Sequence, residues 1–196
     1  MSENTVTDWT VLNEAHAALL TVVRGLTAAD LDRKTPCAEW TVTQVIQHAA
    51  GDQLAYVAAL GAGEGPAENP FAPSGTLTGS PAELVEPAVA AAAAAWAAVP
   101  ADAQAVAVPL PPHTMTAELG AGACALDAAV HAWDLAVASG QSSPLTPELA
   151  ARLLPVAHAI ADPLRGFAFA DALSGNGSDE VGALLRYLGR DPHWQG

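Results

Sequence analysis

Motifs that start α-helices recur along this chain of 196 residues. Thr41 and Gln44 have the spacing of a capping box, and Ser80-Pro81 precedes Glu83 in the order of cap, first-turn proline and acidic residue. Thr146-Pro147-Glu148 repeats the second arrangement. Because such residues satisfy free backbone N–H groups of a first helical turn, they predict helices at all three places.

Apolar residues at helical spacing extend this pattern over most of the chain. The expected helices cover residues 8–24, 41–60, 80 to before Pro100, 117–139, 146–158, and 178 or 179 to 189. Residues 103–108 and 113–116 could pair as a short hairpin, whereas residues 162–177 have no clear pattern. The sequence predicts one all-α domain over residues 1–196: a four-helix bundle with long crossover connections and extra C-terminal helices.

The composition excludes several classes of partner. The net charge is −14, with 7 Lys and Arg against 21 Asp and Glu, which argues against nucleic acids and anionic membranes. Ala88–Ala98 is too short to cross a bilayer, and no signal peptide is evident. Two cysteines, Cys37 and Cys124, make no disulfide framework, so a cytoplasmic, reducing location is expected.

A carboxylate and an imidazole stand four residues apart in the helix expected at 117–139. Asp127 and His131 therefore lie on one face and can direct an oxygen and a nitrogen toward one point, as in a metal site. His48 is a candidate third ligand from another helix. Two histidines, one carboxylate and an open position would suit zinc, nickel or iron. The alternatives are a chance spacing and a buried His48 that hydrogen-bonds a backbone carbonyl.

Several neighbouring residues have both a structural and a functional interpretation. Trp133 and Asp134 are either a core indole and a hydrogen-bonded acid, or partners that support His131 from outside the ligand set. His16 lies on an apolar helix face and could approach the same core. Cys37 and Cys124 are expected to be buried structural thiols, since neither has a flanking lysine or histidine. The chain has no motif for nucleotide binding, for a serine nucleophile or for a His-Glu-x-x-His zinc site.

Two segments resemble a known superfamily. Thr35-Pro-Cys-Ala-Glu-Trp-Thr-Val42, followed by His48-Ala-Ala-Gly51, is similar to a signature of the mycothiol-dependent maleylpyruvate isomerase N-terminal, or DinB-like, superfamily. Val130-His-Ala-Trp-Asp-Leu-Ala136 with Gly140 resembles a second signature of it. Leu188-Gly-Arg-Asp-Pro192 resembles the end of an actinobacterial branch.

The resemblance implies a DinB-like four-helix bundle in which His48, Asp127 and His131 hold a divalent metal, most often zinc. The isomerase has glutamate at the position of Asp127, and it carries a C-terminal domain that this chain is expected to lack, so the resemblance does not carry over the isomerisation of maleylpyruvate itself. Members use the metal to bind the thiolate of a low-molecular-weight thiol such as mycothiol.

The function that follows is a thiol-dependent transferase or isomerase acting on a small electrophile. The alternatives are a non-catalytic metal- or ligand-binding bundle, with a stress-related or structural role, and a bundle whose His–Asp pair holds no metal. Trp194, expected to be exposed, could contribute to a homodimer contact.

Overall fold

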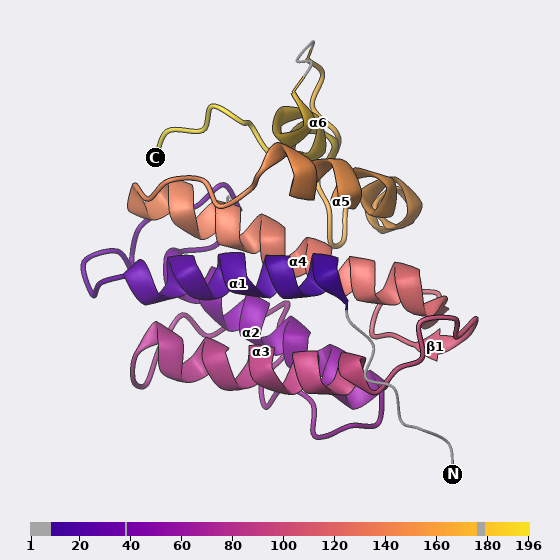
Figure 1. The fold of residues 1–196 in the computed structure, drawn as a ribbon. Helices are drawn as coiled ribbons and strands as arrows, with labels where there is room; N and C mark the ends of the chain where they lie inside the picture. Colours follow the sequence, from indigo (N-terminus) through magenta and orange to yellow (C-terminus); the bar gives the residue numbers. More distant parts are fainter. Residues whose placement is uncertain (1–8, 38, 176–178) are drawn as a thin grey trace.

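The structure, a computed structural model, describes residues 9–37, 39–175 and 179–196. Its helices are α1 (Thr10–Gly25), α2 (Val42–Ala59), α3 (Pro81–Ala97), α4 (Ala117–Ser139), α5 (Pro147–Ile160) and α6 (Glu180–Tyr187). The strands β1 (Val106–Ala107) and β2 (Thr114–Met115) form an antiparallel pair, and Asp162–Leu164 is one turn of 3-10 helix, η1. The all-α prediction is confirmed (Figure 1).

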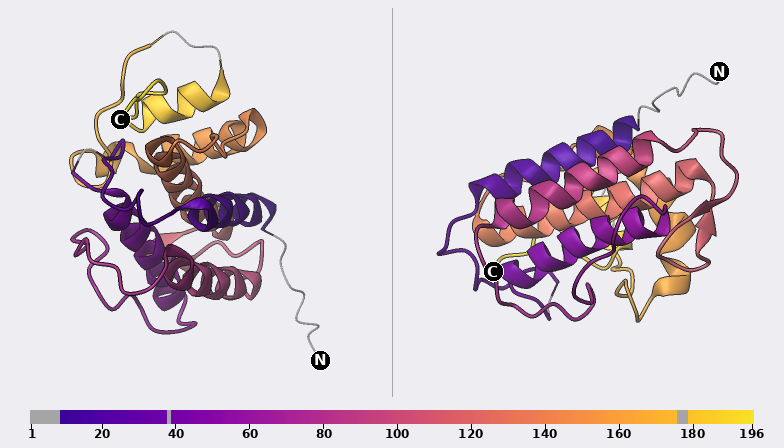
Figure 2. Two further views of the ribbon diagram at one scale, coloured as in Figure 1. Left: turned by 90° about the vertical axis from the view of Figure 1, so that its left-hand side faces the viewer. Right: turned by 90° about the horizontal axis from the view of Figure 1, so that it is seen from below.

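Helices α1 to α4 form the bundle. The helices α1 and α2 each pack against both α3 and α4, so the sequential pairs α1–α2 and α3–α4 lie diagonally. Long crossover connections are therefore required, as predicted, and β1 and β2 lie in the second of them. Figure 2 (right) shows the four helix axes roughly aligned.

Helix α4 lies at the centre of the molecule because α5 covers the side that the bundle leaves open. Figure 2 (left) shows α5 and α6 stacked on one side of the bundle. Nearly every residue of α4 is buried, including His131 and Asp134, and its many alanines allow close packing on all sides. This position places polar side chains of α4 inside the molecule, where they must find partners.

Local signals account for the helix boundaries. Thr41 and Ser80 each form a complete capping box, with Gln44 and Glu83 respectively. Gly140 ends α4 in the left-handed conformation, with φ of 74°, that favours glycine. The expected start at Asp8 and the cap at Ser178 lie outside the described residues, and Asp179 caps α6. Trp194 is partly buried against the core, so the expectation that it is exposed was wrong.

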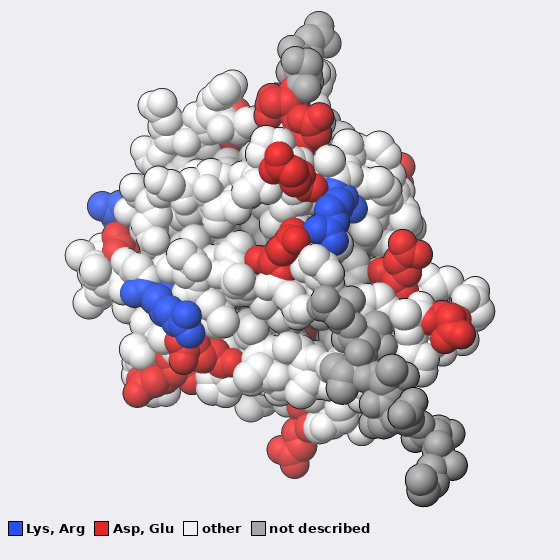
Figure 3. Space-filling view, viewed as in Figure 1, with Lys and Arg blue, Asp and Glu red and all other residues white. Residues whose placement is uncertain are grey.

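Acidic side chains are spread over the face shown in Figure 3, with few basic ones between them. Among the described residues, we find no helix that combines the length and the hydropathy needed to cross a membrane.

Candidate metal centre

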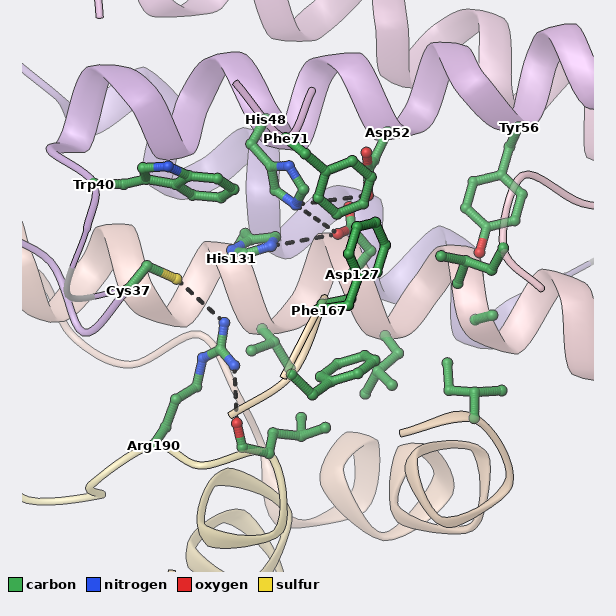
Figure 4. A pocket seen from close by; sticks show the side chains of 18 residues that line it. Cys37, Trp40, His48, Asp52, Tyr56, Phe71, Asp127, His131, Phe167 and Arg190 are labelled. Atoms are coloured by element: carbon green, nitrogen blue, oxygen red, sulfur yellow. Dashed lines mark hydrogen bonds and ion pairs between the residues drawn. The ribbon is translucent and has the colours of Figure 1, made fainter. Parts of the chain in front are cut away.

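Two bundle helices bring the three predicted ligands together. His48 comes from α2, whereas Asp127 and His131 lie one turn apart on α4 (Figure 4). Asp127 Oδ1 is 3.3 Å from His131 Nε2 and 3.6 Å from His48 Nε2. One atom from each side chain lies within 4.8 Å of the other two. The three side chains that the sequence analysis grouped as candidate ligands therefore converge in the structure.

Each imidazole is oriented by a hydrogen bond at its other nitrogen. His48 Nδ1 is 2.9 Å from the backbone oxygen of Pro70, and His131 Nδ1 is 3.0 Å from Asp134 Oδ2. Both of these oxygens can only accept, so each Nδ1 carries the proton and donates. In the neutral rings, both Nε2 lone pairs therefore face Asp127.

A group of converging acceptors needs a cation. Two imidazole lone pairs and a carboxylate oxygen repel one another unless a proton or a metal ion lies among them. In a tetrahedral site with metal–ligand bonds of about 2.0–2.1 Å, the ligand atoms lie roughly 3.3 Å apart, close to the spacings found here. The donor set and its orientation therefore fit a divalent metal such as zinc.

The close approach of these side chains also changes the pKa values of His131 and Asp127. Burial opposes protonation of His131, but the Asp127 and Asp134 carboxylates outweigh it and raise the pKa of His131 well above its ordinary value. Burial likewise opposes ionisation of Asp127, yet His131 and His48 hold the pKa of Asp127 below its usual range. A proton on His131 is thus the competitor of a metal at this site.

Asp52 is a further acidic group of the centre that the sequence analysis missed. Its Oδ2 atom is 3.6 Å from His48 Nε2, one turn further along α2. Burial, together with the negative charge of Asp127, raises the pKa of Asp52 to about 7. The spacing of four residues after His48 is the signal that could have revealed it, by the rule that paired Asp127 with His131.

Asp134 holds His131 and is itself held by Arg190. The guanidinium of Arg190 donates from Nε to Asp134 Oδ1 and from Nη2 to Oδ2, both at 2.9 Å. Burial opposes ionisation of Asp134, but Arg190 and the bond from His131 outweigh it and hold the pKa of Asp134 well below its usual range. Asp134 therefore remains an anion that keeps the Nδ1 proton on His131.

Cys37 belongs to this network. Its Sγ donates to Asp134 Oδ2 at 3.2 Å and accepts from Arg190 Nη2 at 3.3 Å. Cys37, His131 and Asp134 also have the proximity of a metal-ligand set. However, the Arg190 cation already bonds two of the three, so a second metal ion there would meet a fixed positive charge.

The segment before α2 and the loop after it shape the centre. Trp40 lies against His48, with 4.6 Å between ring centroids. The loop after α2 crosses this helix at Gly51, where Pro70 packs closely against the backbone. A Cβ at Gly51 would lie 3.0 Å from Pro70 Cγ, which is too close for an ordinary contact. The absence of a side chain at Gly51 therefore lets Pro70 approach closely enough to bond His48.

The metal centre opens into a cavity of about 370 Å³. Most of its lining is apolar or aromatic, and it comes from the bundle and from the C-terminal segments. Its aromatic and branched aliphatic lining residues include Trp40, Tyr56, Phe71, Leu126, Val130, Ile160, Phe167, Phe169 and Leu188. Phe71 and Phe167, both exposed, lie against each other with ring centroids 5.0 Å apart. Such a pocket, with few polar groups in an apolar wall, is typical of small-molecule sites.

Other residues singled out from sequence lie elsewhere. Trp133 is buried in the hydrophobic core and does not line the cavity. His16 does not reach the three candidate ligands and is connected to Asp127 only through Gln53. Its Nε2 is 2.8 Å from Gln53 Oε1, and Gln53 Nε2 donates to Asp127 Oδ2 at 3.4 Å. Cys124 is buried and bonds Gln53 Oε1 at 3.1 Å, as expected for a structural thiol. The interpretation of Cys37 as purely structural overlooked its place in the cavity wall, next to Arg190.

Comparison with known proteins identifies the family of the bundle. Residues 12–136, which run from α1 almost to the end of α4, match the family described as mycothiol maleylpyruvate isomerase N-terminal domain. Two relatives, Uncharacterized protein MT0763 and Uncharacterized protein Rv0738, come from Mycobacterium tuberculosis strains CDC 1551 and H37Rv. Each is 37% identical over 152 residues, covering 76% of this chain and 75% of the relative. No solved structure matches significantly. The chain therefore belongs to the mycothiol maleylpyruvate isomerase N-terminal domain family.

Proposed function

We propose that this protein is a metal-dependent enzyme that joins a low-molecular-weight thiol, such as mycothiol, to a small electrophile. His48, Asp127 and His131 would hold the metal, for which zinc is the first candidate and nickel and iron are alternatives. The observation that carries the proposal is the convergence of two Nε2 lone pairs and a carboxylate oxygen at one cavity wall. Family membership supports the choice of thiol.

A bound divalent metal would supply the acidity that deprotonates a coordinated thiol at neutral pH. The protein's own groups prepare the reaction. Asp134 and the Pro70 carbonyl fix the two imidazoles, so both Nε2 atoms face the same space. Asp52 lies outside the ligand set, with its carboxylate 3.6 Å from His48 Nε2, and would accept the proton that the thiol releases.

The apolar wall would favour the reaction in a second way. Trp40 and Phe71, whose rings both lie against His48, reduce contact between the centre and water. A thiolate is a stronger nucleophile when it is less hydrated, and electrostatic interactions are stronger in a less polar site. In the transfer step, a sulfur–carbon bond forms to the electrophile. If the electrophile is an aryl halide, the halide leaves with the bonding electrons. If it is an α,β-unsaturated ketone, the π electrons of the C=C bond move toward the carbonyl oxygen, and the α-carbon then takes up the proton that the thiol lost.

A conjugation assay tests the proposal. Zinc-loaded and chelator-stripped protein would be incubated with mycothiol and either an aryl chloride or an α,β-unsaturated ketone, and the conjugates quantified by mass spectrometry. We expect the rate with loaded protein to exceed both the stripped protein and the Asp127→Asn variant by at least about tenfold. Equal rates in all three samples would contradict it. Stoichiometric metal without conjugation would instead support a non-catalytic metal-binding bundle.

A further inference from the structure

The cavity beside the metal centre offers no free positive charge. Arg190 is the only Lys or Arg among the described residues that line it. Its Nε and Nη2 atoms bond Asp134, while Nη1 bonds the Leu188 oxygen at 3.3 Å. Asp52 and Asp127 add two acidic groups. If a divalent ion binds, these two carboxylates balance its charge, so a carboxylate-bearing ligand would find no side-chain cation to pair with and could be held only by the ion itself.

One lining residue carries a polar group without a partner. Tyr56 lines the cavity and is 1% exposed. Its hydroxyl is buried and has no hydrogen-bond partner among the described residues. Figure 4 shows the ring extending from α2 with its hydroxyl directed toward α4, on the opposite side of Asp52 and Asp127 from Trp40. Buried hydroxyls are nearly always hydrogen-bonded, so this one needs an acceptor that the chain does not supply.

The hydroxyl of Tyr56 keeps its proton and is available as a donor. Burial, reinforced by neighbouring negative charges, raises the pKa of Tyr56 well above its ordinary value, so the phenol stays protonated. Tyr56 follows Asp52 by four residues and His48 by eight, so all three lie on one face of α2. A molecule in the cavity can therefore contact Tyr56 and approach the metal centre at the same time.

We propose that the cavity binds an uncharged, mainly apolar molecule that carries a carbonyl or similar acceptor, and that Tyr56 Oη donates to this acceptor. The inference rests on the proposed function only in identifying this molecule as the electrophile. Aromatic and branched aliphatic walls, among them Val130, Ile160 and Phe169, surround its apolar part. The chemical class is therefore neutral carbonyl compounds, which the side chains of the cavity favour over carboxylates.

Two unreactive probes of nearly equal shape test this directly. 4-Phenylbutan-2-one and 3-phenylpropanoate differ in whether a methyl ketone or a carboxylate ends the chain, and neither reacts with thiols. Their dissociation constants would be measured by calorimetry on zinc-loaded protein and on chelator-stripped protein, in which no metal ion can coordinate the carboxylate. In the stripped protein we expect the ketone to bind at least about tenfold more tightly, because the carboxylate loses hydration without gaining a side-chain cation. Equal or tighter binding of the carboxylate to the stripped protein, or no binding of either probe, would overturn the proposal.

A conservative variant tests the role of Tyr56. Tyr56→Phe removes only the hydroxyl, and we expect a fivefold to tenfold weaker affinity for the ketone, as for the loss of one hydrogen bond. The melting temperature should not fall, because the hydroxyl has no partner to lose within the described chain. Tyr187→Phe is the matched control, since the only other tyrosine bonds Asp162 outside the cavity. Unchanged ketone affinity in Tyr56→Phe would refute the assignment.

Failure of this inference is distinguishable from failure of the proposed function. The binding assay needs neither thiol nor turnover. The predicted order of affinities without any conjugation would contradict the enzyme while supporting the cavity assignment. Conjugation that prefers carboxylate-bearing electrophiles would do the reverse.

Discussion

Asp134 connects the candidate metal centre to the C-terminal part of the chain. Its carboxylate accepts from His131, Cys37 and Arg190 and is fully buried. A buried anion of this kind is stable only while its partners remain, because desolvation would otherwise favour the neutral acid. The orientation of His131 therefore depends, through Asp134, on Arg190, which lies 56 positions after Asp134 in the chain.

Removing the cation tests this dependence. We expect Arg190→Gln to lower the free energy of unfolding by about 3–5 kcal/mol at neutral pH, because it leaves the buried Asp134 carboxylate without its main partner. Urea unfolding followed by circular dichroism measures the change. Arg24→Gln is the matched control: Arg24 pairs with Glu86 on the surface, and its loss should change stability by less than about 1 kcal/mol. Similar losses in the two variants would contradict the account.

The effect of Arg190→Gln should also depend on pH. In the wild type, the folded pKa of Asp134 lies below its unfolded value of about 3.9. Its contribution to stability is therefore complete above about pH 4 and is lost as the pH falls through the folded pKa. In the variant, burial without the guanidinium raises the pKa of Asp134, so protonation relieves the penalty. The difference in free energy of unfolding should shrink from pH 7 to pH 3; a constant difference would count against the role of Asp134.

At the residue scale, local spacing predicted part of the centre. Asp127 and His131 are one helical turn apart, so their convergence follows from the helix alone. His48 was named as a candidate from its position in an expected helix, and the resemblance strengthened that choice, because nothing local places α2 against α4. The contacts of Arg190 and Cys37 with Asp134 join residues far apart in sequence and could not be predicted. Trp133, two positions after His131, points to the other side of α4, which explains its place in the core.

At the scale of elements, α2 is the scaffold of the site. His48, Asp52 and Tyr56 follow one another at intervals of four residues, and the capping box at Thr41 fixes where the helix begins. The loop of residues 60–80 returns over α2 at Gly51 and brings the Pro70 oxygen to His48. Helix and loop together therefore set the orientation of one proposed ligand.

A side chain at Gly51 should disturb this arrangement. We expect Gly51→Val to push the Pro70 segment away and to weaken zinc affinity by about tenfold or more, the usual effect of losing a hydrogen bond to a metal-bound histidine. Competition with a chromogenic chelator measures the affinity. Ala58→Val introduces the same side chain at an exposed position of α2 and should leave zinc affinity unchanged. Unaltered affinity in Gly51→Val would show that the Pro70 contact does not matter.

Element boundaries were predicted best where capping chemistry is strong. The starts of α2, α3 and α5 and the end of α4 agree with the predicted positions, and the proposed hairpin is present in shorter form. Residues 162–175 had no recognisable pattern because tertiary contacts, not local propensity, determine their course. That segment nevertheless supplies Phe167 and Phe169 to the cavity.

At the scale of the whole molecule, two parts of the chain divide the site between them. Residues 12–136, which match the family, supply the three converging metal-ligand atoms. The following segments supply the opposite wall of the cavity, with Ile160, Phe167, Phe169, Leu188 and Arg190. Bundle and C-terminal layer are therefore both needed for a closed, apolar pocket at the proposed centre.

The most direct test of the account is the metal content of the protein. Purified wild type, stripped with chelator, reloaded with zinc and desalted, would be analysed by elemental mass spectrometry beside a His48→Ala/His131→Ala variant. The control is His113→Ala/His193→Ala, which removes two exposed histidines that neither line the cavity nor belong to a candidate ligand group. We predict about one ion per chain in wild type and control and none in the His48/His131 variant, with the helical circular dichroism signal retained in all three. Equal metal in all three proteins, or none in the wild type, would contradict the proposed centre.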